Sequence, residues 1–170
     1  MRFQLLMFPA ALVAAAPLQA ADYLTIEQAQ AALFPEATFT PADLLLTETQ
    51  VDELLKTVAA PVFRTKVRAW KVSTGGWFIL DQVMGRDDRV TYAIGIDQNG
   101  IVKGIEILVC LPEYSGIRSP RWRDQFIGKQ SFAFTDIANI SGTTLSVEHI
   151  SEGVRRTIAT YAKFIAQKAG

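Results

Sequence analysis

Hydroxyl-bearing residues directly before a long helical pattern make residues 141–146 the segment of this sequence best suited to bind a phosphate. These residues read Ser-Gly-Thr-Thr-Leu-Ser, and apolar residues then recur at three- and four-residue steps, which predicts a helix. Gly142 permits a tight turn, while free backbone amides at a helix start and nearby hydroxyls suit phosphate oxygens. Ordinary helix capping uses the same residue types, so the spacing alone leaves both interpretations open.

A second group of candidate side chains lies in residues 111–130, a loop broken by Gly and Pro. Tyr114, Trp122 and Phe126 are aromatic and can contact a planar ligand, although packing in the core is the alternative for Trp122 and Phe126. Glu113 can serve a ligand or merely accept hydrogen bonds from loop amides. The basic residues can offset phosphate charge or form a solvated face. They are Arg118, Arg121, Arg123 and Lys129.

Three stretches of the chain resemble, in order and spacing, the signature segments of the FMN-binding domain family. Residues 141–146 are similar to its Ser-Gly-Ala-Thr-x-Thr/Ser signature. Residues 113–116, Glu-Tyr-Ser-Gly, are similar to its Glu-Thr-Pro-Gly loop, and residues 122–129 are similar to its Trp-x-x-Gln-Phe-x-Gly-Lys segment. The resemblance covers residues 77–161, about half of the chain.

That family includes the periplasmic flavin subunits of the Rnf complex and of sodium-pumping NADH:quinone oxidoreductase. In it, a flavin transferase uses FAD to attach FMN to a Thr through a phosphoester, and the position of that Thr here is Thr144. The resemblance therefore implies an exported FMN-binding electron carrier with a flavin transferase for maturation and a membrane-bound or periplasmic redox partner. The implied cofactor-binding residues are Ser141, Gly142, Thr143, Thr144, Leu145, Glu113, Tyr114, Gly116, Trp122 and Lys129.

The sequence departs from the family signatures at three places. Ala138 stands where the family usually has Asp, Thr143 replaces the Ala before the acceptor Thr, and the Glu113 loop lacks its Pro. The first two lie in the region that a transferase would read, so reversible FMN binding, or a binding module of the same fold, is the alternative to covalent attachment. A free-standing flavin reductase is disfavoured because the chain has neither a nicotinamide-binding Gly-rich fingerprint nor a recognisable acid/base pair.

Composition excludes several other functions. The 170 residues include 17 basic and 17 acidic side chains, so net charge does not nominate a nucleic acid as partner. One cysteine, Cys110, rules out an internal disulfide and a cysteine-only metal cage. One histidine, His149, rules out a His-rich zinc site, and no metal site is predicted. We interpret Cys110 as a small buried apolar residue and His149 as a structural residue rather than a proton donor.

The amino-terminal residues read as a targeting segment. Arg2 precedes an apolar run over residues 5–17, and Ala20 offers a small residue at a cleavage site. Residues 1–20 are therefore predicted to be a signal peptide. Residues 21–170 are predicted to form a single FMN-binding domain with an amino-terminal helical extension, exported and soluble after cleavage.

The mature chain reads as an α+β fold. A capping box at Thr25 and Gln28 predicts a helix to about Leu33, and a second helix is expected over residues 50–58. Four strands joined by tight turns predict an antiparallel β-sheet meander flanked by amino-terminal helices and a long carboxy-terminal helix. The strands are expected over residues 66–73, 77–84, 89–96 and 101–110.

The long carboxy-terminal helix should lie on the sheet, because Val147, Ile150, Val154, Ile158, Tyr161 and Ile165 form one apolar stripe. Ser146 is predicted to cap this helix. Glu148 is predicted to lie in its first turn, where negative charge suits the helix dipole.

Overall fold

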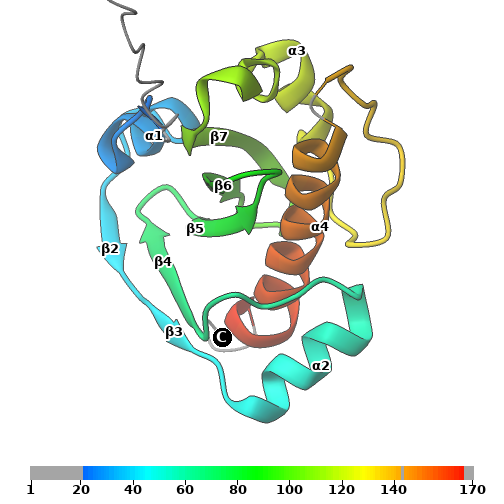
Figure 1. Cartoon of the computed structure of the whole chain (residues 1–170). Coiled ribbons are helices and arrows are strands. Elements are labelled where there is room, and N and C mark those ends of the chain that lie inside the picture. The colour runs from blue at the N-terminus through cyan, green and yellow to red at the C-terminus, as the bar shows by residue number, and fades with distance from the viewer. Residues whose placement is uncertain (1–20, 143, 167–170) are drawn as a thin grey trace, which may run out of the picture.

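The sheet that organises the molecule is a curled antiparallel meander, seen in a computed structural model that describes residues 21–142 and 144–166 (Figure 1). The predicted signal peptide, residues 1–20, and Thr143 lie outside the described residues. The four long strands confirm the predicted meander with bounds that differ by at most one residue. They are β4 (Lys66–Val72), β5 (Trp77–Met84), β6 (Arg89–Ile96) and β7 (Val102–Cys110).

Short strands extend the meander at both sides. Within the described residues the strand order is β1-β7-β6-β5-β4-β2, and β3 pairs with the start of β4. These additional strands were not predicted, and each has only two or three residues: β1 (Ala21–Asp22), β2 (Phe39–Pro41) and β3 (Leu44–Leu45). Strand β4 pairs with β5 only as far as the partners Arg68 and Leu80, so β5 continues from Asp81 to Met84 without a β4 partner.

Helices cover both faces of the sheet, as expected for the predicted α+β class (Figure 1). Helix α1 (Ile26–Leu33) begins with the predicted capping box, in which Thr25 and Gln28 exchange hydrogen bonds. Helix α2 (Glu48–Val58) begins two residues before the predicted start, because Thr47 and Gln50 form a second capping box.

The long helix α4 (Thr144–Thr160) continues into a wider final turn, η3 (Tyr161–Ile165). Its predicted start was wrong. Ser146 lies inside the helix and is only 1% exposed, so it does not cap the helix, and Glu148 lies beyond the first turn, which holds no acidic residue among those described. The helix includes Thr144 and Leu145 ahead of Ser146, so the Ser146 hydroxyl lies buried within its first turn and not in the preceding loop.

The predicted apolar stripe of α4 forms the larger core. Ile150, Val154 and Ile158 are buried against sheet residues such as Ile79 and Ile94. On the other face of the sheet, Leu33 and Phe34 near the end of α1 pack with Phe78, Ala93 and Leu108. Strand β6 contributes to both layers, and all of its residues after Arg89 are buried.

Cys110 is buried at the end of β7, as predicted for a small apolar residue. Burial raises the pKa of its thiol, which keeps the group uncharged at neutral pH.

Helix α4 approaches the sheet closely at Gly153. A Cβ atom at this position would lie 2.6 Å from Val83 Cγ1 and 2.7 Å from the Tyr92 hydroxyl oxygen. We expect Gly153→Ala to lower the free energy of unfolding by about 1–3 kcal/mol, because overpacking outweighs the gain of about 1 kcal/mol in helix propensity. Urea denaturation would measure this loss. Glu148→Ala, at an exposed position of the same helix, serves as the control, and an equally stable Gly153→Ala protein would contradict the packing argument.

Candidate functional site

The start of helix α4 presents an accessible hydroxyl. Thr144 is the first residue of the helix and is exposed, as are Ser141 and Gly142 before it. Gly142 has a φ angle of +85°, and a Cβ there would meet no atom within 4 Å, so backbone conformation rather than crowding requires glycine. Leu145 is 47% exposed. The described part of this segment is therefore open to solvent and to a modifying enzyme.

Helix α4 also brings an unsatisfied polar group to its own first turn. Ser146 Oγ is buried and has no hydrogen-bond partner among the described residues. The first backbone N–H groups of a helix lack intrahelical partners and favour negative charge nearby. The first turn of α4 therefore offers the exposed Thr144 and backbone amides without intrahelical partners, which suit a phosphate group, while the Ser146 hydroxyl is enclosed on the inner side of the turn.

A compact helical stretch covers the end of β7 and carries the other predicted site residues (Figure 1). It consists of η1 (Pro112–Arg118), α3 (Pro120–Arg123) and η2 (Asp124–Phe126). Trp122 is 3% exposed and Phe126 is fully buried, and their rings pack edge to face with centroids 5.2 Å apart. Both aromatic residues therefore belong to the core.

Trp122 and Gln125 hold the loop that leads into Ser141. Trp122 Nε1 donates a hydrogen bond to the carbonyl oxygen of Ala138 at 3.1 Å, and the Ala138 N–H donates to Gln125 Oε1 at 2.7 Å. Ala138 takes part in both hydrogen bonds through its backbone, as acceptor in the first and as donor in the second. The family's Trp-x-x-Gln pattern has a positioning role here, and the absence of Asp at position 138 leaves these two bonds intact.

Lys129 fixes the same loop electrostatically. Its Nζ contacts both carboxylate oxygens of Asp136 at 2.6–2.7 Å, and the backbone of residues 128 and 129 exchanges hydrogen bonds with Val102 of β7. The hydrogen bond from Lys129 lowers the pKa of Asp136 below its ordinary value of 3.8. The ion pair is therefore fully formed above that value and is lost as the pH falls through the lowered pKa.

We expect Lys129→Ala to raise the pKa of Asp136 towards 3.8, because the largest cause of its depression is removed. A pH titration of the Asp136 carboxyl carbon by NMR would measure the change. Arg121→Ala, which removes an exposed cation from the neighbouring helix α3, serves as the control. An unchanged Asp136 titration in Lys129→Ala would show that another group holds the carboxylate.

Tyr114 ties η1 to the hairpin between β5 and β6. Its hydroxyl donates to Asp87 Oδ2 at 2.9 Å and accepts from the Asp87 N–H at 3.1 Å. Burial, and then the hydrogen bond with Asp87, raise the pKa of Tyr114, so the phenol stays protonated and can donate. Its neighbours differ in exposure: Glu113 is exposed, whereas Gly116 is half-buried.

His149 holds the other side of the same hairpin. Its Nδ1 lies 2.5 Å from the carbonyl oxygen of Met84 and must be the donor, because a carbonyl only accepts. Tyr114 and His149 therefore link η1 and α4 through residues 84–88. The sequence predicted the turn between these strands but not the two contacts, because each contact joins residues far apart in the chain.

The arginines do not form one solvated face. Arg123 pairs with Glu106 and donates to the carbonyl oxygens of Arg118 and Ile105 at 3.0 and 2.9 Å. The Arg118 guanidinium lies 3.7 Å from the ring centroid of Tyr23, and its Nε is buried without a hydrogen-bond partner in the described residues. Arg121 is exposed.

The three segments also agree with a known family. Residues 85–159 match the model of the family described as the FMN-binding domain. This range begins at the turn between β5 and β6 and includes β6, β7, η1, α3, η2 and most of α4. This segment is an FMN-binding domain. Its cofactor is FMN. A comparison of the chain with curated proteins gives no match.

Two kinds of feature are absent from the part of the chain that the structure describes. Over residues 21–142 and 144–166, no helix is both long and apolar enough to cross a membrane. In the same residues, no three His, Cys, Asp or Glu side chains gather closely enough to bind a metal ion.

Proposed function

We propose that this protein is an exported electron-transfer protein that carries FMN through a phosphoester on Thr144. The main support is the exposed Thr144 hydroxyl at the first residue of α4, within a matched FMN-binding domain and directly after an open turn. Bound FMN supplies hydride and one-electron transfer chemistry, while the protein supplies binding and orientation.

Attachment requires a partner enzyme, a flavin transferase that uses FAD. Thr144 Oγ1 forms a new bond to the phosphorus on the FMN side of FAD, the pyrophosphate bond to the AMP half breaks, and AMP leaves. The hydroxyl proton is released to a base of the transferase. Exposure of residues 141, 142, 144 and 145 supports this step, because the transferase must reach the hydroxyl from solvent.

Once attached, the phosphate would lie at the amino terminus of α4. Backbone amides without intrahelical partners favour its negative charge there. The loop bonds made by Trp122 and Gln125, together with the Lys129–Asp136 pair, fix the segment before Ser141. These contacts support a role for residues 122–129 in positioning the attachment segment rather than in contacting the flavin ring.

The covalent link can be tested on the mature protein. Co-expression with a flavin transferase that modifies other members of the family, followed by denaturing electrophoresis, should give a flavin-fluorescent band. A yellow native protein with a dark denatured band would show reversible binding and overturn the phosphoester. A colourless protein that also takes up no added FMN would overturn the flavin assignment itself.

Export and electron transfer have separate tests. The Arg2 and apolar segment of residues 1–20 support cleavage after Ala20. Mass spectrometry of a periplasmic fraction should therefore find a chain that begins at Ala21, and a cytoplasmic full-length chain would contradict export. A membrane-bound or periplasmic redox partner should reduce the flavin protein, whereas rapid oxidation of NADH by the purified protein alone would identify a reductase instead.

A further inference from the structure

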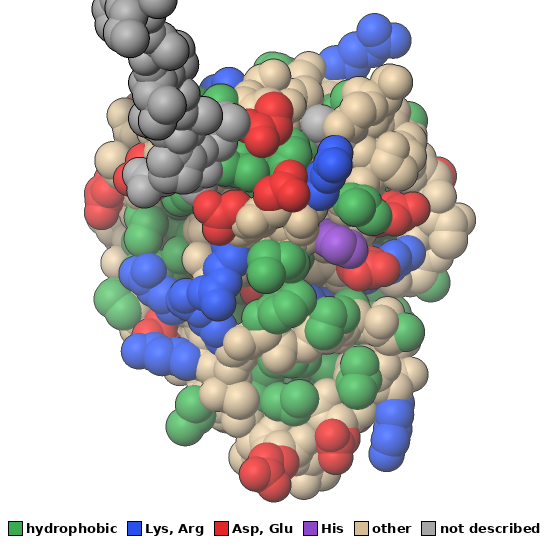
Figure 2. Space-filling model, viewed as in Figure 1, with side chains coloured by type: hydrophobic (Ala, Val, Ile, Leu, Met, Phe, Trp, Pro, Cys, Tyr) green, Lys and Arg blue, Asp and Glu red, His purple; other side chains and the backbone are tan. Residues whose placement is uncertain are grey.

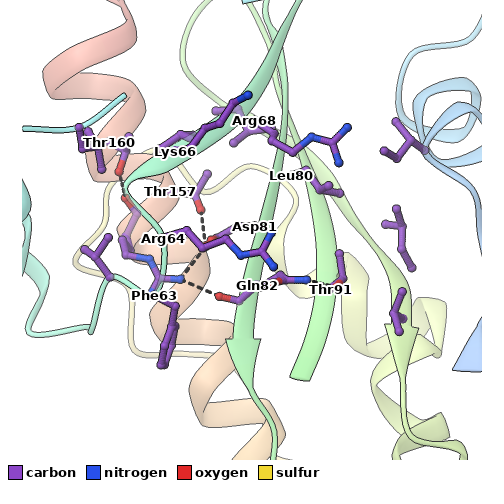
Figure 3. Close-up of a pocket in the computed structure, with 18 of the residues that line it drawn as sticks. Phe63, Arg64, Lys66, Arg68, Leu80, Asp81, Gln82, Thr91, Thr157 and Thr160 are labelled. Atoms are coloured by element: carbon purple, nitrogen blue, oxygen red, sulfur yellow. Dashed lines mark hydrogen bonds and ion pairs between the residues drawn. The ribbon is translucent and has the colours of Figure 1, made fainter. Parts of the chain in front are cut away.

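A cavity of about 310 Å³ opens where strands β4 and β5 separate (Figure 3). The first residues of β4, Lys66 and Val67, pair with β3, whereas β5 loses its β4 partner after Leu80. The cavity fills the wedge between the two strands, with the carboxy-terminal half of α4 at its side. It therefore lies where the sheet opens, and residues 62–64 before β4 and 24–26 at the start of α1 complete its lining.

The inner wall of this cavity is mainly apolar and well ordered by packing. Leu54 and Ile79 are fully buried, and Leu46 is 5% exposed. Asp81 lies deeper, where its Oδ2 accepts hydrogen bonds from Arg156 at 2.6 Å and from the Tyr92 hydroxyl at 2.8 Å. The buried charge of Arg156 is thus already compensated by the half-buried Asp81, so a ligand need not neutralise either of them.

The rim of the cavity is strongly basic. Arg64 precedes β4, whereas Lys66 and Arg68 belong to β4. Figure 3 shows the side chains of these three residues at the cavity. Figure 2 shows Lys and Arg side chains gathered on the surface over β4. Lys66 is paired with Asp43 at 3.0 Å, and Arg68 lies over the Trp70 ring at 5.2 Å. With Arg156 inside, four cationic residues and one carboxylate line the cavity.

The cavity is separate from the FMN attachment segment. Its lining contains no residue of 113–116, 122–129 or 141–146. Its lining residues from α4 are Arg156, Thr157 and Thr160, and even Arg156 lies more than three helical turns beyond Thr144. A ligand in this cavity would therefore be an additional one rather than the phosphate of FMN on Thr144.

We propose that this cavity is a binding site for a small organic anion with an apolar body, of the carboxylate class. The apolar wall receives the body and the exposed guanidinium groups of Arg64 and Arg68 receive the carboxylate, as bidentate Arg–carboxylate pairs do. The volume lies at the small end of the range for ligand pockets, which limits the ligand to about one or two rings or a short chain. A cation is excluded by the charge of the rim.

Calorimetric titration with 2-naphthoate and with its neutral analogue 2-naphthamide tests this proposal on the mature, FMN-loaded protein. We expect naphthoate to bind at one site per chain and at least about tenfold more tightly than the amide, because only the acid pairs with the rim arginines. Its affinity should fall as salt is added, while that of the amide should not. The salt series uses the unaltered protein and so does not depend on the folding of any variant.

The double variant Arg64→Ala/Arg68→Ala should weaken naphthoate binding about tenfold and leave naphthamide binding unchanged. Arg89→Ala, which removes an exposed cation that does not line the cavity, is the matched control. Equal affinity of acid and amide, or an unaffected double variant, would overturn the proposal. Stoichiometric displacement of naphthoate by added FMN would also overturn it, because the cavity would then hold flavin.

Discussion

Replacement of Thr144 by alanine is expected to abolish covalent attachment of FMN while the domain stays folded. The side chain is exposed at the first residue of α4, so its loss leaves no cavity in the core. Without the hydroxyl there is no oxygen to form the phosphoester. The fluorescent band on a denaturing gel should disappear completely, and the mass of the protein should fall by that of the attached FMN.

Two neighbouring changes make this result specific. Thr144→Ser keeps a hydroxyl at the same position and should retain at least part of the fluorescence. Thr143→Ala alters the adjacent hydroxyl and restores a residue type that the family signature has there, so it should retain the band. A band that persists in Thr144→Ala but disappears in Thr143→Ala would move the attachment to Thr143.

Asp81→Ala is expected to lower the free energy of unfolding by about 3–5 kcal/mol, because it leaves the Arg156 guanidinium buried without its counter-ion. The Arg156 side chain is 6% exposed, and it also donates to the carbonyl oxygens of Pro61 and Gln82. The same change removes an acceptor from the Tyr92 hydroxyl, which is fully buried. Chemical denaturation of the purified protein would measure the loss.

The pair Lys129–Asp136, whose carboxylate is exposed, provides the comparison for this measurement. Asp136 is 67% exposed, so Asp136→Ala should lower the free energy of unfolding much less than Asp81→Ala does. The double variant Asp81→Leu/Arg156→Met should recover much of the stability lost in Asp81→Ala, since it removes both buried charges together. If Asp81→Ala were no less stable than Asp136→Ala, water would have to reach Arg156 in the folded protein.

Much of the fold follows from local sequence signals. The capping box at Thr25 and Gln28 located helix α1, and the turns around Gly75, Gly85 and Gly100 located the four long strands. The short strands β1, β2 and β3 carry too few residues to show an alternating pattern and exist only through pairing with β7 and β4. The start of α4 was misplaced because both Thr144 and Ser146 have capping side chains, and only burial against the rest of the fold distinguishes them.

The candidate site was predictable in its segments but not in its internal contacts. The motif around Gln125 was visible, yet its bond to the backbone of Ala138 depends on the path of a loop. Likewise, Tyr114 and His149 meet the hairpin through Asp87 and Met84, contacts that no local spacing encodes. Trp122, which the sequence offered for contact with the flavin ring, donates a hydrogen bond to the loop before the attachment segment. Contact between Trp122 and the flavin ring stays a prediction.

The place where β5 runs on beyond Leu80 has a consequence for the solution behaviour of the protein. An unprotected strand margin is a template on which a second polypeptide can add itself, and this is how many aggregates begin. Arg156 satisfies one acceptor of that margin, because its guanidinium donates a hydrogen bond to the Gln82 carbonyl oxygen at 3.2 Å. A second strand would have to displace this hydrogen bond in order to pair with β5 at Gln82.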